Sequence, residues 1–297
     1  MDRSNKLQKC VIGALFAGIT LECHAARVPW AIRRAESGLF LGIGENILHT
    51  QESASGSPIA SEDGDLSAYT LGLAHLGSRA GGLYWRLRLT GAFGTTRYHG
   101  NTALGLPAQG SNTGRVVSID GRLGLGIDGL WRGDRALILI PYLGMGFQRS
   151  TLGGDRNSAY AGDETLTGGH LGLGLGAGYA LDRRWVLSLH ALTGYTLGTQ
   201  ATATIPTFFD ASTGTLQSTR VAETLGDRPY EAIGGAISYR ADRRLDISLH
   251  VRRAIWSATG SGPIPILDSS GVTLGTTRIP SSRSTDTSIL IEVRTLF

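Results

Sequence analysis

The stretch Leu83-Tyr84-Trp85-Arg86-Leu87-Arg88-Leu89-Thr90 decides the fold, because every second residue in it is apolar. A β-strand sends alternate side chains to opposite faces, so this strand has one apolar face and one cationic face. A water-soluble sheet normally turns its apolar face inward and leaves its charges in water. The composition of the other strands indicates which of the two faces is enclosed here.

The same alternation recurs at 115–130, 165–181, 185–200, 245–258 and 284–297. The polar faces combine glycine with single charges of both signs and hardly any lysine, which is typical of a barrel lumen and unlike a solvated surface. The apolar faces end in aromatic residues, as expected for girdles at the two membrane interfaces. These aromatic residues are Trp85, Trp131, Tyr179, Trp185, Tyr195, Tyr230, Tyr239, Trp256 and Phe297.

The fold class predicted is all-β: an antiparallel transmembrane β-barrel of about ten strands, with eight or twelve left open. The strands are expected at 38–50, 65–77, 82–98, 115–130, 136–149, 165–181, 185–200, 229–240, 245–258 and 284–297. Tight turns alternate with long connections rich in Ser, Thr, Gly and Asp, at 51–64, 99–114, 150–164, 201–228 and 259–283. Short periplasmic turns with long extracellular loops are the outer-membrane pattern.

The N-terminus indicates export. Residues 1–25 predict a signal peptide, with cations at the start, an apolar run at 11–21, and small residues Cys23 and Ala25 before the cleavage site. Residues 26–37 are then a periplasmic N-terminal segment, and 38–297 form the barrel. Both cysteines of the chain lie in the predicted leader, so disulfides and thiolate metal sites are excluded from the mature chain.

The last strand carries the most specific signal. Thr287-Ser-Ile-Leu-Ile-Glu-Val-Arg-Thr-Leu-Phe297 alternates and ends the chain on an aromatic residue. With the leader and the strands before it, this segment resembles Gram-negative outer-membrane β-barrel proteins of the small porin-like or autotransporter type. The resemblance implies a bacterial outer-membrane location and contact with outer-membrane lipid. It also implies that Phe297 is a signal for the barrel-assembly machinery.

Charged residues on the polar faces are expected to meet inside the barrel. Bare charges in a narrow lumen need partners or water, so we predict a lumen charge network. Its members are Arg86, Arg88, Asp120, Arg122, Asp128, Asp246, Arg252, Glu292 and Arg294. Paired charges would plug the barrel, whereas an open lumen would let the same residues select ions. Ten strands lie nearer to the filled eight-strand barrels than to open porins.

Other lumen features have mainly structural interpretations. The glycines of Gly172-Leu-Gly-Leu-Gly-Ala-Gly178 keep a period of two, so they are expected to make room for bulky neighbours rather than bind phosphate. His170, His190 and His250 are predicted to face the lumen. The strands of His190 and His250 are separated by another strand, about 10 Å in total. We therefore expect hydrogen bonds there, and no metal site.

Catalysis is not predicted. Among the outer-membrane β-barrel proteins that the chain resembles, the omptin proteases are ten-stranded barrels with an Asp pair facing an Asp-His pair at the outer rim. Here Asp63 and Asp65 lie opposite His49, but the loop 99–114 has no acid and Asp210 has no histidine nearby. The expected role is structural or a surface interaction with an extracellular ligand through the loops. A narrow channel for small solutes or ions is the alternative, and a hydrolase comes third.

The charge distribution excludes one further partner class. The formal net charge is +4, and the cations are mostly scattered arginines. No basic block of the kind that binds nucleic acid is present. No cofactor is expected.

Overall fold

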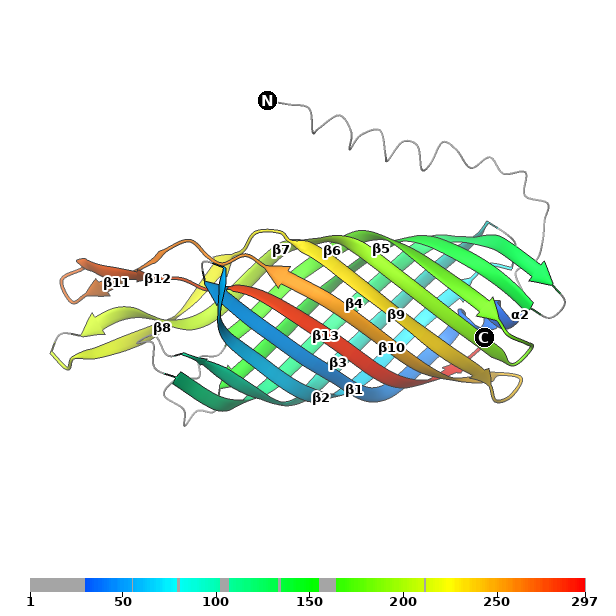
Figure 1. Cartoon of the computed structure of the whole chain (residues 1–297), viewed down its shortest axis with the longest axis horizontal. Coiled ribbons are helices and arrows are strands. Elements are labelled where there is room, and N and C mark those ends of the chain that lie inside the picture. The colour runs from blue at the N-terminus through cyan, green and yellow to red at the C-terminus, as the bar shows by residue number, and fades with distance from the viewer. Residues whose placement is uncertain are drawn as a thin grey trace, which may run out of the picture.

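Figure 1 shows a computed structural model of the chain, in which tilted antiparallel strands close into a barrel. The structure describes residues 30–54, 56–78, 81–101, 107–132, 135–154, 164–210 and 212–296. The predicted signal peptide and Phe297 lie outside these ranges, so cleavage after Ala25 and the assembly role of Phe297 stay predictions.

Ten of the strands in the described residues form the barrel wall. They are β1 (Gly38–Ala54), β2 (Ser57–Leu76), β3 (Gly82–Asn101), β4 (Pro107–Arg132), β5 (Arg135–Gly154), β6 (Glu164–Ala180), β7 (Trp185–Asp210), β9 (Pro229–Arg240), β10 (Leu245–Ala258) and β13 (Ser281–Thr295). Neighbouring wall strands are antiparallel, and β1 pairs with both β2 and β13. The seam between β7 and β9, from Trp185–Tyr239 to Tyr195–Pro229, closes the ring. The predicted all-β, ten-strand barrel is confirmed.

The connections differ from the prediction at one end. The expected loops at 51–64 and 99–114 are largely strand, because β1 to β4 continue their pairing well past the apolar belt. Alternation fades there because neither face meets lipid, and a sheet with two polar faces leaves no period-two signal. We call this the long-loop end, and the opposite end, which holds the tight turns at 181–184 and 241–244, the short-turn end.

Three further strands extend from the long-loop end: β8 (Thr215–Thr224), β11 (Ile264–Asp268) and β12 (Thr273–Thr277). β8 pairs with the distal half of β7. β11 lies parallel to the tip of β7 through Leu267–Phe208 and pairs with β12. The projection is visible at the left of Figure 1. The predicted loops 201–228 and 259–283 therefore contain a small sheet that continues the barrel wall.

The barrel is apolar outside and charged inside. Leu87 is 45% exposed and Ile291 is 56% exposed, whereas Arg88 is 6% exposed and Glu292 is 1% exposed. This is the arrangement that a barrel in lipid needs and the reverse of a water-soluble barrel. The transmembrane interpretation of the alternation is confirmed. Across the described ranges, no helix is long and apolar enough to span a membrane.

Two of the predicted girdle residues were assigned to the wrong face. Tyr230 is 1% exposed and Trp256 is 3% exposed, and both lie in the lumen core. Each has the parity of inward Arg252 on the paired strands β9 and β10, so alternation places them inside. Trp185 and Tyr195 lie on the outer face as predicted, at 41% and 59% exposure.

Candidate functional site

A carboxylate at the centre of the lumen gathers three guanidinium groups. Glu292 of β13 accepts a hydrogen bond from Arg88 Nη2 and another from Arg86 Nη2 at 3.4 Å, and Arg294 Nη2 lies 4.0 Å away. All four side chains are under a tenth exposed. Burial of a charge is costly unless it is paired, so this cluster depends on its mutual contacts.

The ring of Phe40 supports the same arginines. This β1 side chain is fully buried, and the guanidinium carbons of Arg86, Arg88 and Arg294 lie 4.7, 5.4 and 5.2 Å from its ring centroid. The negative face of an aromatic ring attracts cations at these distances. Phe40 can be so placed because the facing residue is Gly72, where a Cβ atom would overlap the ring.

A second group of charges lies further toward the long-loop end. Arg252 of β10 donates to Asp120 Oδ1 at 3.3 Å and to the Tyr230 hydroxyl at 2.7 Å. His170 Nε2 lies 3.5 Å from the same Asp120 oxygen, and its ring stacks on Tyr230 with centroids 4.0 Å apart. The group joins strands from opposite sides of the barrel, so it braces the wall across its interior.

The N-terminal segment closes the short-turn end. Helix α2 (Trp30–Ala35) lies inside this mouth, with Ile32 fully buried in the lumen core. Arg34 Nε donates to Asp246 at 2.6 Å, and its Nη atoms donate to backbone carbonyls of the β9–β10 turn and of Leu245. Just after the helix, Glu36 accepts a hydrogen bond from Ser188 at 2.7 Å and lies 3.9 Å from Arg86.

The histidines face the lumen as predicted, but two of them are closer than the strand spacing indicated. The rings of His190 and His250 stack with centroids 5.7 Å apart. The strand between them presents Gly234, where a Cβ atom would lie 2.6 Å from His190 Cε1, so the rings can lean over it. No cluster of three or more metal-ligating side chains occurs among the described residues.

The inward glycines of β6 make room for bulky side chains, as predicted. A Cβ atom at Gly174 would overlap the ring of Tyr142, and one at Gly178 would lie 2.8 Å from Ile32 of α2. These side chains occupy the centre of the lumen in the described part of the chain. The cavity at its centre has a volume of only about 20 Å³, room for about one water molecule.

The predicted lumen residues thus fall into three groups. Arg86, Arg88, Glu292 and Arg294 form the central cluster, Asp120 and Arg252 the second group, and Asp246 binds α2. Arg122 lies on the cavity wall, with its guanidinium carbon 5.1 Å from the Tyr142 ring centroid. Asp128 belongs to β4, but its side chain lies outside those that the structure describes.

Four participants are not among the lumen residues predicted from the sequence. Phe40 and Tyr230 have inward parity and could have been found by alternation. Arg34 and Glu36 could not, because they precede the first strand, where no period of two applies. Only their charge and their place before an apolar strand were visible.

An acidic cluster lies at the mouth of the long-loop end, beyond the apolar belt. Glu52, Glu62 and Glu164 have inward parity on β1, β2 and β6. Burial, and then the charge of Glu52, raise the pKa of Glu164 to about 8. Burial also raises the pKa of Glu62, although Thr96 and Asn112 donate hydrogen bonds to it. At neutral pH the cluster therefore retains a proton that isolated glutamates would lose.

Structural comparison identifies the architecture. The outer membrane protease OmpT from Escherichia coli has a TM-score of 0.53 at 9% sequence identity, over 92% of this chain and 98% of that chain. The chain has the fold of an outer-membrane β-barrel. The translocator domain of the autotransporter NalP from Neisseria meningitidis gives a TM-score of 0.39 at 12% identity, over 99% and 96% of the two chains. The toluene transporter TodX from Pseudomonas putida gives 0.35 at 8% identity, over 90% and 98%.

At the level of sequence, no family model and no curated protein matches the chain. The conclusion about the fold rests on the comparison with OmpT and on the barrel itself. A shared barrel fold does not determine activity, because function depends on particular sites.

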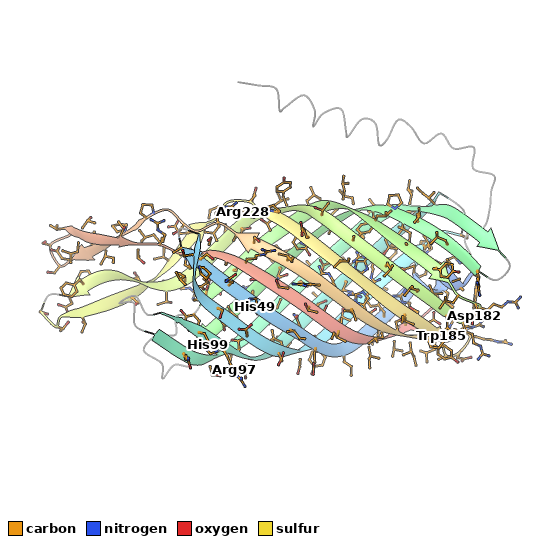
Figure 2. All side chains as sticks on the ribbon, in the orientation of Figure 1. His49, Arg97, His99, Asp182, Trp185 and Arg228 are labelled. Atoms are coloured by element: carbon orange, nitrogen blue, oxygen red, sulfur yellow. The ribbon has the colours of Figure 1, made fainter. Side chains whose placement is uncertain are left out.

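An acid–histidine pair lies near the long-loop end of the barrel. His49 Nδ1 forms a hydrogen bond with Asp63 Oδ1 between β1 and β2, and both side chains are about half exposed. His49, which is labelled in Figure 2, has the parity of outward Ile47 and Ile43, and Asp63 is its partner in the register, so both side chains lie on the outer face and not over the lumen. Asp210 lies apart from them at the β7–β8 turn, where Ser212 donates two hydrogen bonds to it.

Proposed function

We propose that the protein is a closed outer-membrane barrel, with a role that is structural or exercised through its extracellular surface. The observation that carries this proposal is the filled lumen. Helix α2 occupies the short-turn end, the charge network crosses the centre, and the cavity there measures about 20 Å³. A solute path would require these groups to move apart, which would break several buried ion pairs at once.

The long-loop end has exposed surface that could bind a ligand. The β11–β12 hairpin exposes Val272 at 58% and Leu274 at 55%, beyond the apolar belt of the barrel. A hollow of about 380 Å³ lies at the rim, where β9 begins, between Arg228, Glu231 and Arg283. Exposed apolar side chains and a polar hollow together favour contact with an extracellular ligand.

Conductance of planar bilayers tests the sealed lumen. Refolded protein, with folding checked by a heat-dependent shift in gel mobility, should insert and give no discrete open levels. A general porin in the same bilayers shows that the measurement would detect an open barrel. Reproducible unitary steps from the folded protein would contradict the proposal and support the narrow channel.

The proposal also excludes hydrolysis. Protease chemistry at a rim needs groups that activate water against a bound peptide, and within the described residues His49 and Asp63 face away from the lumen mouth. Incubation with unstructured peptides should leave them intact. Cleavage that is lost in a His49→Ala variant of the same folded barrel would support a hydrolase instead.

A further inference from the structure

The cavity at the centre of the lumen has more positive than negative groups around it. Arg86, Arg122 and Arg294 line it, against Glu36 and Glu292. A fourth arginine, Arg88, binds Glu292 from the side. The nearby acids Asp120 and Asp246 are engaged elsewhere, by Arg252 with His170 and by Arg34. Arg252 also has the buried carboxyl of Asp286 nearby, so five guanidinium groups share the carboxylates of Glu36, Glu292, Asp120 and Asp286, and one positive charge is in excess in this buried interior.

Several N–H groups at this place also lack an acceptor. Arg294 lines the cavity, and its Nε and Nη1 are buried and make no hydrogen bond in the part of the chain that the structure describes. His190 Nε2 is buried and unpaired as well, and His190 lines the cavity. Buried polar atoms are nearly always satisfied, so the unpaired nitrogens of Arg294 and His190, which both line this cavity, indicate a missing partner there. The Phe40 ring attracts the cations but accepts none of these in-plane hydrogen bonds.

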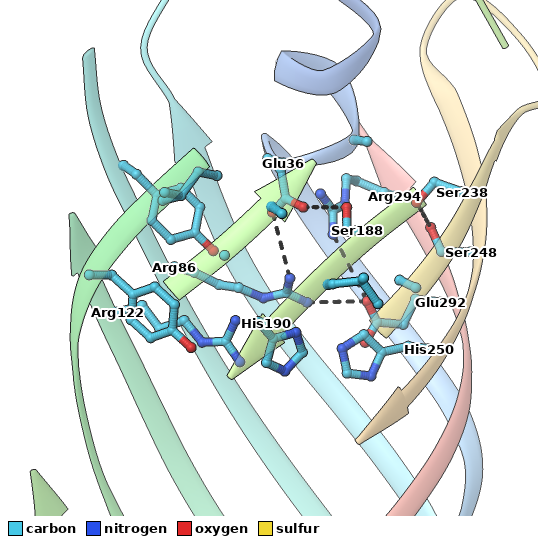
Figure 3. Close-up of a pocket in the computed structure, with 18 residues that line it drawn as sticks. Glu36, Arg86, Arg122, Ser188, His190, Ser238, Ser248, His250, Glu292 and Arg294 are labelled. Atoms are coloured by element: carbon cyan, nitrogen blue, oxygen red, sulfur yellow. Dashed lines mark hydrogen bonds and ion pairs between the residues drawn. The ribbon is translucent and has the colours of Figure 1, made fainter. Parts of the chain in front are cut away.

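The size and charge of the space limit what the acceptor can be. A cavity of about 20 Å³ holds one water molecule or one monatomic ion, and it is too small for a carboxylate ligand or a phosphate. A water molecule could accept hydrogen bonds but would leave the excess positive charge in place. A monatomic anion supplies both an acceptor and the missing charge. Figure 3 shows Arg86 and Arg122 extending toward His190 from one side, with Glu292 and His250 opposite.

We propose that this lumen cavity binds one monovalent anion of the halide class, held by the arginine cluster next to His190. The anion is a structural counterion that completes the sealed interior. This site goes beyond the proposed surface role, and an extracellular ligand would not alter it.

Anomalous diffraction from crystals grown in bromide tests the site directly. The expected result is one bromide peak in the cavity lined by Arg122, Arg294 and His190, replaced by a weaker peak in chloride. Density that fits water in both salts, with no anomalous signal, would overturn the proposal.

Thermal unfolding of the refolded barrel gives a second, independent measurement. The melting temperature should rise with the logarithm of chloride concentration when gluconate, which is too large for the cavity, keeps the ionic strength constant. The Arg122→Met variant removes the excess cation and should lose this dependence. Arg97→Met, on the exposed outer face, is the matched control and should keep it.

The two measurements cover a failure of the variant to fold, because the bromide experiment uses the unmodified chain. A chloride dependence equal in the unmodified protein and in Arg122→Met would contradict the site. So would equal stabilisation by gluconate and chloride.

Discussion

At the scale of single residues, the packing of the lumen depends on glycines, which leave room for bulky side chains opposite them. Gly174 and Gly176 both face inward from β6, but only the first lies against the ring of Tyr142. Tyr142 in turn donates a hydrogen bond to the Ala191 carbonyl at 3.0 Å. The position of this ring in the lumen is therefore determined by the glycine opposite it.

We expect Gly174→Ala to destabilise the barrel by about 1–3 kcal/mol, because the added methyl group overlaps a ring that packed neighbours hold in place. Urea unfolding in detergent or lipid vesicles, followed by tryptophan fluorescence, measures the change. Gly176→Ala is the control on the same face of the same strand, since its Cβ atom would lie 3.4 Å from Ile140 Cβ. Equal effects of the two variants would show that the overlap with Tyr142 does not matter.

The same scale shows how far alternation predicts the site. It placed Leu87 outside and Arg88 inside, because lipid and lumen impose opposite requirements on neighbouring residues. Tyr230 and Trp256 follow the parity of their strands and lie inside, although their aromatic type is typical of the interface girdles. The ion-pair partners of the lumen charges cannot be predicted from the sequence, because they depend on which strands face each other across the lumen and not on the pattern within a strand.

At the scale of elements, the short helix α2 closes the short-turn end of the barrel through several buried contacts. Arg34 is 3% exposed and ties the helix to Asp246 and to the carbonyls of the β9–β10 turn. A six-residue helix is not stable by itself in water, so its conformation depends on these contacts. The sequence predicts only a periplasmic segment here, because nothing in the pattern of residues 30–37 indicates where the segment docks.

Arg34→Gln should lower the stability of the barrel by about 3–5 kcal/mol, because it leaves Asp246 buried without its cation. Chemical unfolding of the refolded protein measures this loss. Arg33→Gln, in the same helix, should change stability by less than about 0.5 kcal/mol.

A double variant sharpens this test. Adding Asp246→Asn to Arg34→Gln removes the uncompensated charge and should recover part of the loss, as a double-mutant cycle would show. If the effects of the two substitutions simply add, the ion pair does not secure the helix.

At the scale of the whole molecule, the long-loop end of the barrel should make stability depend on pH. The carboxyl of Glu164, at the long-loop end, keeps its proton to about pH 8, well above the ordinary value of 4.5. Between these values the folded state binds more protons than the unfolded state. The contribution of this cluster to stability is therefore full below about pH 4.5 and is lost as pH rises toward 8.

We expect Glu164→Gln to remove most of this loss, so that the variant gains stability relative to the unmodified protein as pH rises from 5 to 8. Melting temperatures of both proteins across this range, compared at each pH, isolate the cluster from other titrating groups. Glu231→Gln, on the outer face, should follow the unmodified protein. A constant difference between Glu164→Gln and the unmodified protein would contradict the expected proton uptake.

One strand, β7, belongs both to the barrel wall and to the projecting sheet. β7 closes the ring through β9 and then continues between β8 and β11. β7 runs as one strand from Trp185 to Asp210, so a pull on the projecting tip would be carried along this strand into the barrel wall. Such a force loads the closing seam in shear, the direction in which many bonds must rupture together. An attachment made at this tip would thus have the mechanical resistance of the entire cylinder behind it.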